Sequence, residues 1–158
     1  MNQPEAPAKA TYMRLLRELV QAYQAFEAYT VPHIKSWGLT PAQFDVIATL
    51  GNTEGMTFRE LGERTLIYKT TLTSVVDRLQ ERGLVERRPS PTDRRSTLAL
   101  LTEQGDALFQ EAFSDHTEHL RRRLERLSEQ EMEEAIVQLR RVRDTSADAI
   151  AGSCALFC

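Results

Sequence analysis

Hydrophobic residues recur at helical spacing between residues 69 and 82. Leu72, Val75, Val76 and Leu79 follow the i, i+3, i+4, i+7 pattern, which places them on one stripe of a helix. The opposite face carries small polar side chains, and Gly83 then supplies a residue suited to the left-handed conformation that ends many helices. The pattern predicts a short amphipathic helix with one buried face and one face left for solvent or a partner.

A hairpin with a positively charged tip is predicted directly after this helix. Residues 84–88 and 97–101 are suited to strands, and residues 89–93, beginning with Pro89, have the composition of a turn. Arg94 and Arg95 stand at the tip, where arginine can reach phosphates or a narrow minor groove, and Asp93 can hold a guanidinium in position. The alternative is an ordinary exposed charged turn. The whole stretch from Leu61 to Gly105 thus reads as two short helices, a strand, a cationic tip and a second strand. This is the order of parts in a winged helix-turn-helix, which docks one helix in a DNA groove.

Helix start signals recur along the rest of the chain. Thr40, Thr57 and Ser128 are each followed three residues later by Gln or Glu, as in a capping box, and Thr102 is a fourth candidate. A first helix is expected from about Ala8 and should end or kink near Pro32. One face of this first helix is apolar and comprises Leu15, Leu16, Leu19, Tyr23 and Phe26.

Two long amphipathic helices are predicted after the hairpin. Their apolar faces comprise Leu108, Ala112, Phe113, Leu120, Leu124 and Leu127 in the first, and Met132, Ala135, Ile136, Leu139 and Val142 in the second. A small lobe cannot cover so many apolar faces, so we expect both ends of the chain to pack with a second copy across a two-fold axis. The alternative is a monomer whose helices fold back on the lobe.

The predicted fold class is mainly α with a small β-wing, in one structural unit. The expected parts are an N-terminal dimerisation helix (1–37), a winged helix-turn-helix DNA-binding lobe (38–102), C-terminal dimerisation helices (103–150) and a flexible tail (151–158). A chain of 158 residues with 41% hydrophobic content is sufficient for a single core.

Charge is distributed unevenly along the chain. The net charge is −3, yet residues 69–95 hold seven Lys or Arg against four Asp or Glu. An acidic body that carries a basic lobe can still be steered towards nucleic acid. No apolar run approaches the ~20 residues of a membrane span, and the first ten residues lack the features of a secretory signal. We therefore expect a cytoplasmic protein without a membrane partner.

Three segments of the sequence resemble the MarR/SlyA family of bacterial transcriptional regulators. They are VVDRLQERGLVERRPSPTDRR and LTEQG in the predicted lobe and GLTPAQFDVIATL before it, and the similarity covers nearly the whole chain. The resemblance implies an obligate homodimer that binds palindromic promoter DNA, with the second helix of the lobe in the major groove and the wing in the minor groove. The candidate DNA contacts are Lys69, Thr70, Thr71, Thr73, Ser74 and Arg78 on the helix, and Arg87, Arg88, Asp93, Arg94 and Arg95 on the wing.

The chain departs from the family pattern at two positions. Tyr68 stands where many relatives have a small capping residue, which leaves open whether it begins or precedes the recognition helix. Ser74 stands where relatives often carry Arg, and this changes the DNA sequence that is read. The operator is therefore not predicted.

The family usually responds to a small molecule or to oxidation. The resemblance implies a pocket for an aromatic or phenolic anion where the first two helices meet the lobe. The candidate lining residues are Tyr23, Phe26, Tyr29, His33, Trp37 and Phe44, although aromatic residues at helical spacing are also common in cores.

Two other groups of residues are candidate sensors. His116 and His119 share a helix face at a spacing that can hold zinc, but with acidic neighbours a solvated face is the preferred interpretation. Cys154 and Cys158 are the only cysteines and lie in the tail, where they form either a redox pair or two free thiols. No cofactor is predicted.

Motifs typical of enzymes, such as a glycine-rich phosphate loop, are absent from the sequence. Three functions are considered. The first is a homodimeric repressor of its own or a neighbouring promoter, released by a small molecule or an oxidant. The second is a helical interaction module with a winged fold that does not bind DNA. The third is a metal or redox sensor whose output is DNA binding.

Overall fold

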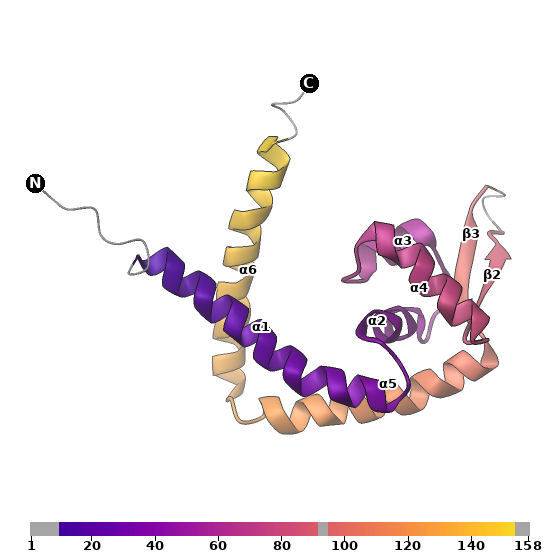
Figure 1. Cartoon of the computed structure of the whole chain (residues 1–158), viewed down its shortest axis with the longest axis horizontal. Coiled ribbons are helices and arrows are strands. Elements are labelled where there is room, and N and C mark those ends of the chain that lie inside the picture. Colours follow the sequence, from indigo (N-terminus) through magenta and orange to yellow (C-terminus); the bar gives the residue numbers. More distant parts are fainter. Residues whose placement is uncertain (1–9, 92–94, 154–158) are drawn as a thin grey trace, which may run out of the picture. The chain divides into compact units, whose positions relative to one another are not determined.

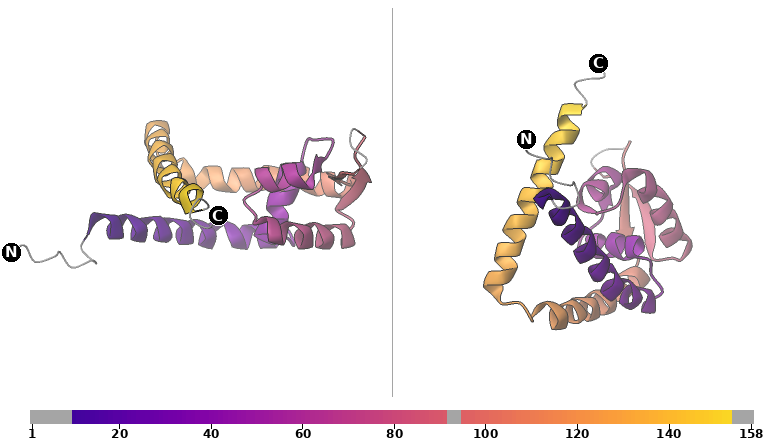
Figure 2. Two further views of the ribbon diagram at one scale, coloured as in Figure 1. Left: turned by 90° about the horizontal axis from the view of Figure 1, so that it is seen from above. Right: turned by 60° about the vertical axis from the view of Figure 1, so that its left-hand side comes forward.

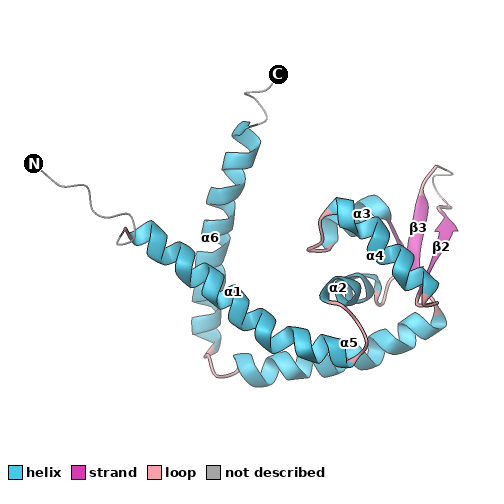
Figure 3. Ribbon diagram, in the orientation of Figure 1, coloured by secondary structure: helices cyan, strands magenta, loops and turns pink. Residues whose placement is uncertain are grey.

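The computed structural model describes residues 10–91 and 95–153, with only the backbone described for Lys69 and residues 147–153. It is mainly helical with a small sheet, which confirms the predicted fold class (Figure 1, Figure 3). In chain order the elements are α1 (Thr11–Ser36), α2 (Pro41–Leu50), β1 (Met56–Thr57), α3 (Phe58–Arg64), α4 (Lys69–Glu81), β2 (Val85–Pro89), β3 (Thr97–Leu101), α5 (Glu103–Leu124) and α6 (Glu129–Ser153).

The chain divides into two compact units, Met1–Thr117 and Glu118–Cys158. The first unit holds α1 to α4, the sheet and most of α5. The second holds the end of α5 and all of α6, which continues three residues beyond the limit expected for the C-terminal helices.

A three-stranded antiparallel sheet forms the wing and its base, in the order β1-β3-β2. The long ladder pairs Val85 with Leu101 at one end and Pro89 with Thr97 at the other. The composition predicted that Pro89 is the first residue of the turn. It is instead the last residue of β2. The sequence analysis did not predict β1, whose two residues pair with β3. Two residues are too few to show an alternating pattern.

The core of the first unit lies between the helices of the lobe and the inner face of the sheet. The stripe predicted on α4 is buried, and Val76 and Leu79 have no exposed surface. It packs with side chains from α2, α3, the sheet and α5, namely Val46, Ile47, Leu50, Leu61, Val85, Ala99 and Phe109. This burial leaves only the polar face of α4 for contacts outside the lobe.

All four predicted helix starts are confirmed. The hydroxyls of Thr40, Thr57 and Ser128 accept hydrogen bonds from the backbone N–H three residues on. In return, the backbone N–H of each cap residue donates to the Gln or Glu side chain at that third position. Thr102 accepts from the N–H of Gly105 at 3.0 Å and donates to the carbonyl of Gly83 at 2.6 Å. Thr102 therefore begins α5 and also ties it to the end of α4.

The end of α4 is also as predicted. Gly83 has a φ of +70°, its N–H donates to Gln80, and the N–H of Leu84 donates to Leu79. This pair of bonds is a Schellman motif, which satisfies the last carbonyls of the helix and turns the chain into β2.

The sequence predicts that the first helix ends or kinks near Pro32, and the first of these alternatives is wrong. The helix α1 continues through Pro32 to Ser36, and its expected start near Ala8 lies outside the described residues. Ile34 is buried beyond the proline, and the N–H groups of Trp37 and Gly38 close the last turn. Tertiary packing of this last turn outweighs the lost hydrogen bond, and the helix stops where Gly38 adopts a φ of +69°.

Apolar side chains remain exposed in each unit. Only the C-terminal part of α1 packs on the lobe (Figure 2), and residues 11–28 are exposed throughout. The large exposed apolar side chains of α1 are Tyr12, Met13, Leu15, Leu16, Leu19, Val20, Tyr23 and Phe26. In the second unit the corresponding side chains are Leu124, Leu127, Ile136, Val137 and Leu139.

Gly105 has no room for a side chain, because a Cβ there would lie 1.9 Å from the carbonyl oxygen of Leu84. That oxygen already accepts from the N–H of Thr102, so it cannot move without loss of a hydrogen bond. We predict that Gly105→Ala lowers the free energy of unfolding by about 3 kcal/mol, as measured by urea denaturation. Gly83→Ala, which introduces only left-handed strain, should cost about 1 kcal/mol. Equal losses for the two variants would contradict this account of the LTEQG segment.

Candidate nucleic-acid interface

The polar face of α4 is exposed along its length. Among the sequence candidates on this helix, Thr70, Thr71, Thr73, Ser74 and Arg78 all have exposed side chains, whereas the side chain of Lys69 lies outside the described residues. The hydroxyl of Ser74 donates to the carbonyl of Thr71 at 2.8 Å. Short side chains held close to the helix allow the backbone to approach a groove closely.

Tyr68 precedes α4 and occupies its N-cap position. Its backbone is extended, its carbonyl accepts from the N–H groups of Thr71 and Leu72, and its side chain makes no capping hydrogen bond. The phenol is 84% exposed. A phenolic O–H beside the start of the helix can donate to an anionic oxygen such as that of a phosphate.

The turn between α3 and α4 is fixed by a carboxylate that the sequence analysis did not identify. Asp45 of α2 accepts a hydrogen bond from the N–H of Leu66 at 2.8 Å, and burial raises the pKa of this carboxyl above its ordinary value. Leu66 itself is 97% exposed, while the next residue, Ile67, packs on the core. The contact spans 21 positions in the sequence, so no local pattern could reveal it.

The arginines of the wing occupy different environments. The guanidinium of Arg87 turns towards α4, where it meets Asp77 at 2.6 Å and Gln80 at 2.9 Å. Arg88 pairs with Glu86 of the same strand and is 65% exposed. Arg95 is exposed, and Asp93 and Arg94 lie outside the described residues. The candidates on β2 therefore split into one inward and one outward arginine.

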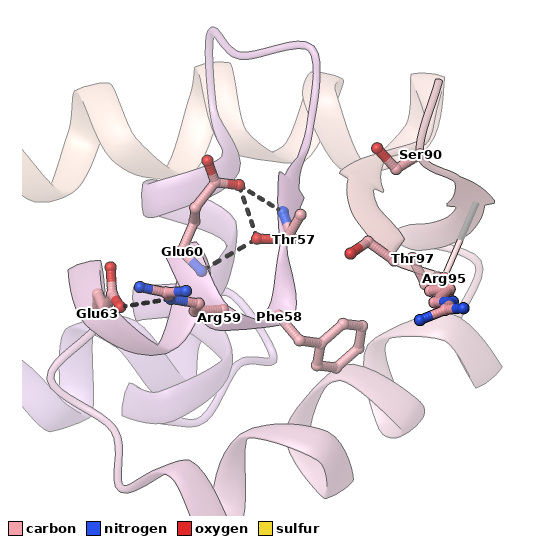
Figure 4. Close-up of a pocket in the computed structure, with 9 residues that line it drawn as sticks. Thr57, Phe58, Arg59, Glu60, Glu63, Ser90, Arg95 and Thr97 are labelled. Atoms are coloured by element: carbon pink, nitrogen blue, oxygen red, sulfur yellow. Dashed lines mark hydrogen bonds and ion pairs between the residues drawn. The ribbon is translucent and has the colours of Figure 1, made fainter. Parts of the chain in front are cut away.

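A hollow of about 710 Å³ lies between α3 and the wing. It is lined by Thr57, Phe58, Arg59, Glu60, Glu63, Ser90, Arg95, Ser96 and Thr97. Figure 4 shows Phe58 extending from α3 towards the wing, with Arg95 and Thr97 on the opposite side. The hairpin above it is closed by a hydrogen bond from the N–H of Ser90 to the carbonyl of Ser96 at 2.9 Å. The sequence analysis did not predict this hollow.

A cluster of aromatic and charged side chains joins α1, α2 and α5 within the first unit. We call it the junction cluster, and it comprises His33, Trp37, Phe44, Asp115 and His116. The Nδ1 atoms of His33 and His116 are 3.1 Å apart, so one imidazole donates and the other accepts. Asp115 Oδ2 accepts from Trp37 Nε1 and contacts His33 Nε2, both at 3.2 Å. The ring of Phe44 meets His116 edge-on at 4.8 Å.

The preferred interpretation of a solvated face is wrong for His116. This side chain is only 6% exposed, because residues from α1 and α2 that are distant in sequence cover it, while His119 is half-buried. Within the described part of the chain, no group of three or more His, Cys, Asp or Glu side chains is arranged to hold a metal ion. Cys154 and Cys158 lie outside the described residues.

The junction cluster includes three of the six candidate ligand-pocket residues. His33, Trp37 and Phe44 belong to it, and Tyr29 is half-buried one turn earlier on α1. Tyr23 and Phe26 are exposed further along the helix. The hydroxyl of Tyr23 donates to Glu27 at 2.9 Å, and this hydrogen bond to a carboxylate raises the pKa of the phenol.

None of the helices among the described residues is both long enough and apolar enough to span a membrane.

Comparison with known proteins identifies the family. Residues 37–96, which span the lobe, match the sequence profile described as the MarR family. The chain is 34% identical over 130 residues to the HTH-type transcriptional regulator MhqR of Bacillus subtilis, which covers 82% of this chain and 90% of MhqR. It is 30% identical over 113 residues to the HTH-type transcriptional repressor MdtR of the same organism, covering 72% of this chain and 73% of MdtR.

A solved structure shows that the likeness extends to the fold. The structure is described as "Mechanism for regulation of DNA binding of Bordetella bronchiseptica BpsR by 6-hydroxynicotinic acid". It superposes with a TM-score of 0.73 at 28% sequence identity, covering 90% of this chain and 99% of that one. Because a named regulator that is 34% identical covers 82% of this chain, and the sequence profile of the family matches residues 37–96, this chain belongs to the MarR family of transcriptional regulators.

Proposed function

We propose that the protein is a homodimeric repressor that binds a pseudo-palindromic promoter sequence, with α4 in the major groove and the wing in the minor groove. The observation that carries the proposal is the exposed hydroxyl-rich face of α4, held on a helix whose other face is fully packed. Direct reading of bases needs polar side chains on a helix that fits the major groove, and short ones let the helix backbone come close to the base edges.

Charge and the similar proteins support DNA as the partner. The segment from Lys69 to Arg95 is net positive in a chain that is acidic as a whole. Positive charge concentrated at one surface neutralises phosphates and steers association. MhqR is named a regulator and MdtR a repressor, so repression is the mode that we propose for this chain.

The exposed apolar side chains support a dimer as the functional form. Eight large apolar side chains are exposed along α1, and another five are exposed from Leu124 to Leu139. Each buried Å² of apolar surface is worth roughly 25 cal/mol, so exposed rows of this size favour association. A second copy presents the same rows and is the partner that we propose. Two lobes in one dimer read two half-sites.

The junction cluster supports an aromatic acid as the effector. Trp37 Nε1 and His33 Nε2 both contact the Asp115 carboxylate and are set among aromatic rings, so a flat ligand with its own carboxylate or hydroxyl can bind there by taking the place of Asp115. Regulation of BpsR is described with 6-hydroxynicotinic acid, a ligand of this chemistry. We propose that such a ligand binds near the cluster and releases DNA. A redox role for Cys154 and Cys158 stays a prediction from the sequence.

The DNA-binding proposal predicts a particular outcome when the protein selects duplexes from a random library. We expect a two-fold symmetric consensus with half-site centres about 10 base pairs apart. Ser74→Arg should change the preferred bases, because arginine makes bidentate contacts to guanine. Arg95→Ala should instead weaken binding to every sequence and reduce the salt slope by about 1. An unchanged preference for Ser74→Arg would contradict the assignment of α4 as the reading helix.

The dimer proposal is tested by placing charge within the apolar row of α1. Size-exclusion chromatography with light scattering should give the wild-type protein a mass about twice that of the 18.0 kDa chain. Leu16→Glu combined with Leu19→Glu should shift the mass towards the monomer and weaken DNA binding, since buried carboxylates are costly. Gln21→Glu adds a charge on the opposite side of the same helix and should remain dimeric. A wild-type monomer, or a dimer unaffected by the double variant, would refute the proposed interface.

The ligand proposal has a built-in probe, because Trp37 is the only tryptophan in the chain. We predict that 6-hydroxynicotinic acid changes Trp37 fluorescence over the same concentration range in which it releases labelled DNA. Free N-acetyltryptophanamide measured in parallel corrects for absorption by the ligand. If release occurs without any specific change in fluorescence, the site lies elsewhere; if neither occurs up to millimolar concentrations, this ligand class is wrong.

A further inference from the structure

We propose that Arg87 is a positioning residue that braces the wing against the recognition helix, and that it does not contact DNA directly. The inference rests on the proposed function, since it concerns how α4 and the wing engage DNA together. We call the group formed by Arg87, Asp77, Gln80 and Phe58 the brace.

The brace connects three elements of the lobe. From β2, Arg87 Nη2 donates to Asp77 Oδ1 at 2.6 Å and Nη1 donates to Gln80 Oε1 at 2.9 Å, so one guanidinium spans almost a full turn of α4. The centre of the same guanidinium lies 5.1 Å from the centroid of the Phe58 ring on α3, within the range of a cation–π contact.

Strand geometry explains why Arg87 faces inward. Alternate residues of a strand point to opposite faces, so Arg87 shares a face with the buried Val85, while Glu86 and Arg88 share the other. Arg87 lies opposite Ala99, which is fully buried. Its side chain is 29% exposed, compared with 65% for Arg88. A half-buried guanidinium with two hydrogen bonds and an aromatic partner is poorly available to phosphate.

The brace supplies an angular constraint that the chain connection lacks. Only residues 82–84 link the end of α4 to the start of β2, and the core and the pairing with β1 hold the hairpin near its base, where Val85 and Ala99 are buried. Further out, β2 becomes exposed from Arg88 onwards. Arg87 gives β2 a further attachment to α4, at Asp77 and Gln80, and this attachment fixes the tilt of the hairpin. Lysine cannot replace arginine in this role, because a single ammonium lacks the planar fork that meets Asp77 and Gln80 together.

Replacement of Asp77 tests the proposal, because the brace and simple charge repulsion predict opposite changes in DNA affinity. It lies one turn beyond Ser74 on the polar side of α4, so its negative charge stands on the face proposed to meet DNA. If Asp77 acted only as a charge, its removal would relieve repulsion of phosphates and strengthen binding. If Asp77 holds the wing through Arg87, its removal weakens binding.

The experiment measures binding to a labelled duplex that the wild-type protein has selected from a random library, by fluorescence anisotropy. We expect Asp77→Asn and Arg87→Lys each to lower affinity by about tenfold, the value of one charge-assisted hydrogen bond. The double variant should lose little more than either single variant, because the two residues act through one contact. Hydroxyl-radical footprints should lose protection in the minor groove while methylation protection of guanine in the major groove persists.

Glu81→Gln is the matched control, since it removes a carboxylate from the same helix one turn beyond Asp77. It should leave affinity unchanged or slightly higher, and thermal unfolding should show that each variant is folded at the assay temperature. Tighter binding by Asp77→Asn, or wild-type affinity for Arg87→Lys, overturns the brace. An equal loss for Glu81→Gln also overturns it, because the effect would then be general to α4. Absence of sequence-dependent binding by the wild-type protein would refute the proposed function itself.

Discussion

Burial of one face of α4 is the constraint on which the rest of the lobe depends. Val76 and Leu79 are fully enclosed by side chains from α2, α3, the sheet and α5, so the helix has one orientation about its axis. Rotation by one residue would bury threonine hydroxyls and expose the apolar stripe, at a cost of several kcal/mol. The hydroxyl-rich face therefore points outward because of the core and not because of any contact made by that face.

Contacts distant in sequence then position the ends of this helix. Asp45 holds the turn before α4, Thr102 holds its end, and Arg87 ties it to β2. Asp45 and Arg87 are both partly buried, and hydrogen bonds that involve charged groups are stronger than those between neutral groups. Under the proposed function, such a scaffold presents α4 and the strands β2 and β3 to DNA in fixed positions, which reduces the entropic cost of association.

Local chemistry explains which features the sequence could predict. The stripe of α4, the four caps and the left-handed Gly83 all depend on residues within a few positions of one another, and the structure confirms them. Arginines at 87 and 88 look equivalent in sequence, and only the strand register shows that one faces inward. The burial of His116 and the anchor at Asp45 required knowledge of which helices meet. The prediction that α1 ends near Pro32 failed because the packing of Ile34 outweighs the preference of proline for a helix end.

The MarR family assignment and the geometry together give a consistent account of how this chain acts. Under the proposed function, a packed lobe presents α4 as the reading helix beside a wing held by Arg87, and the exposed apolar rows on α1 and in the second unit pack against a second copy. The junction cluster links α1 and α5 with α2 of the lobe. A ligand that altered the contacts of the junction cluster would act on the joint between the proposed dimerisation helix and the lobe. Under the proposed function, that joint sets the spacing of two reading heads.

The most direct test of this account is the affinity of the purified protein for DNA from upstream of its own gene, compared with scrambled DNA of equal length over a salt series. The account predicts tight, sequence-dependent binding that falls by roughly 10³ or more between 50 and 200 mM salt if about six or more phosphates are neutralised. Weak binding that is equal on both duplexes at every salt concentration would contradict it, and would favour a winged protein-interaction module that does not recognise DNA.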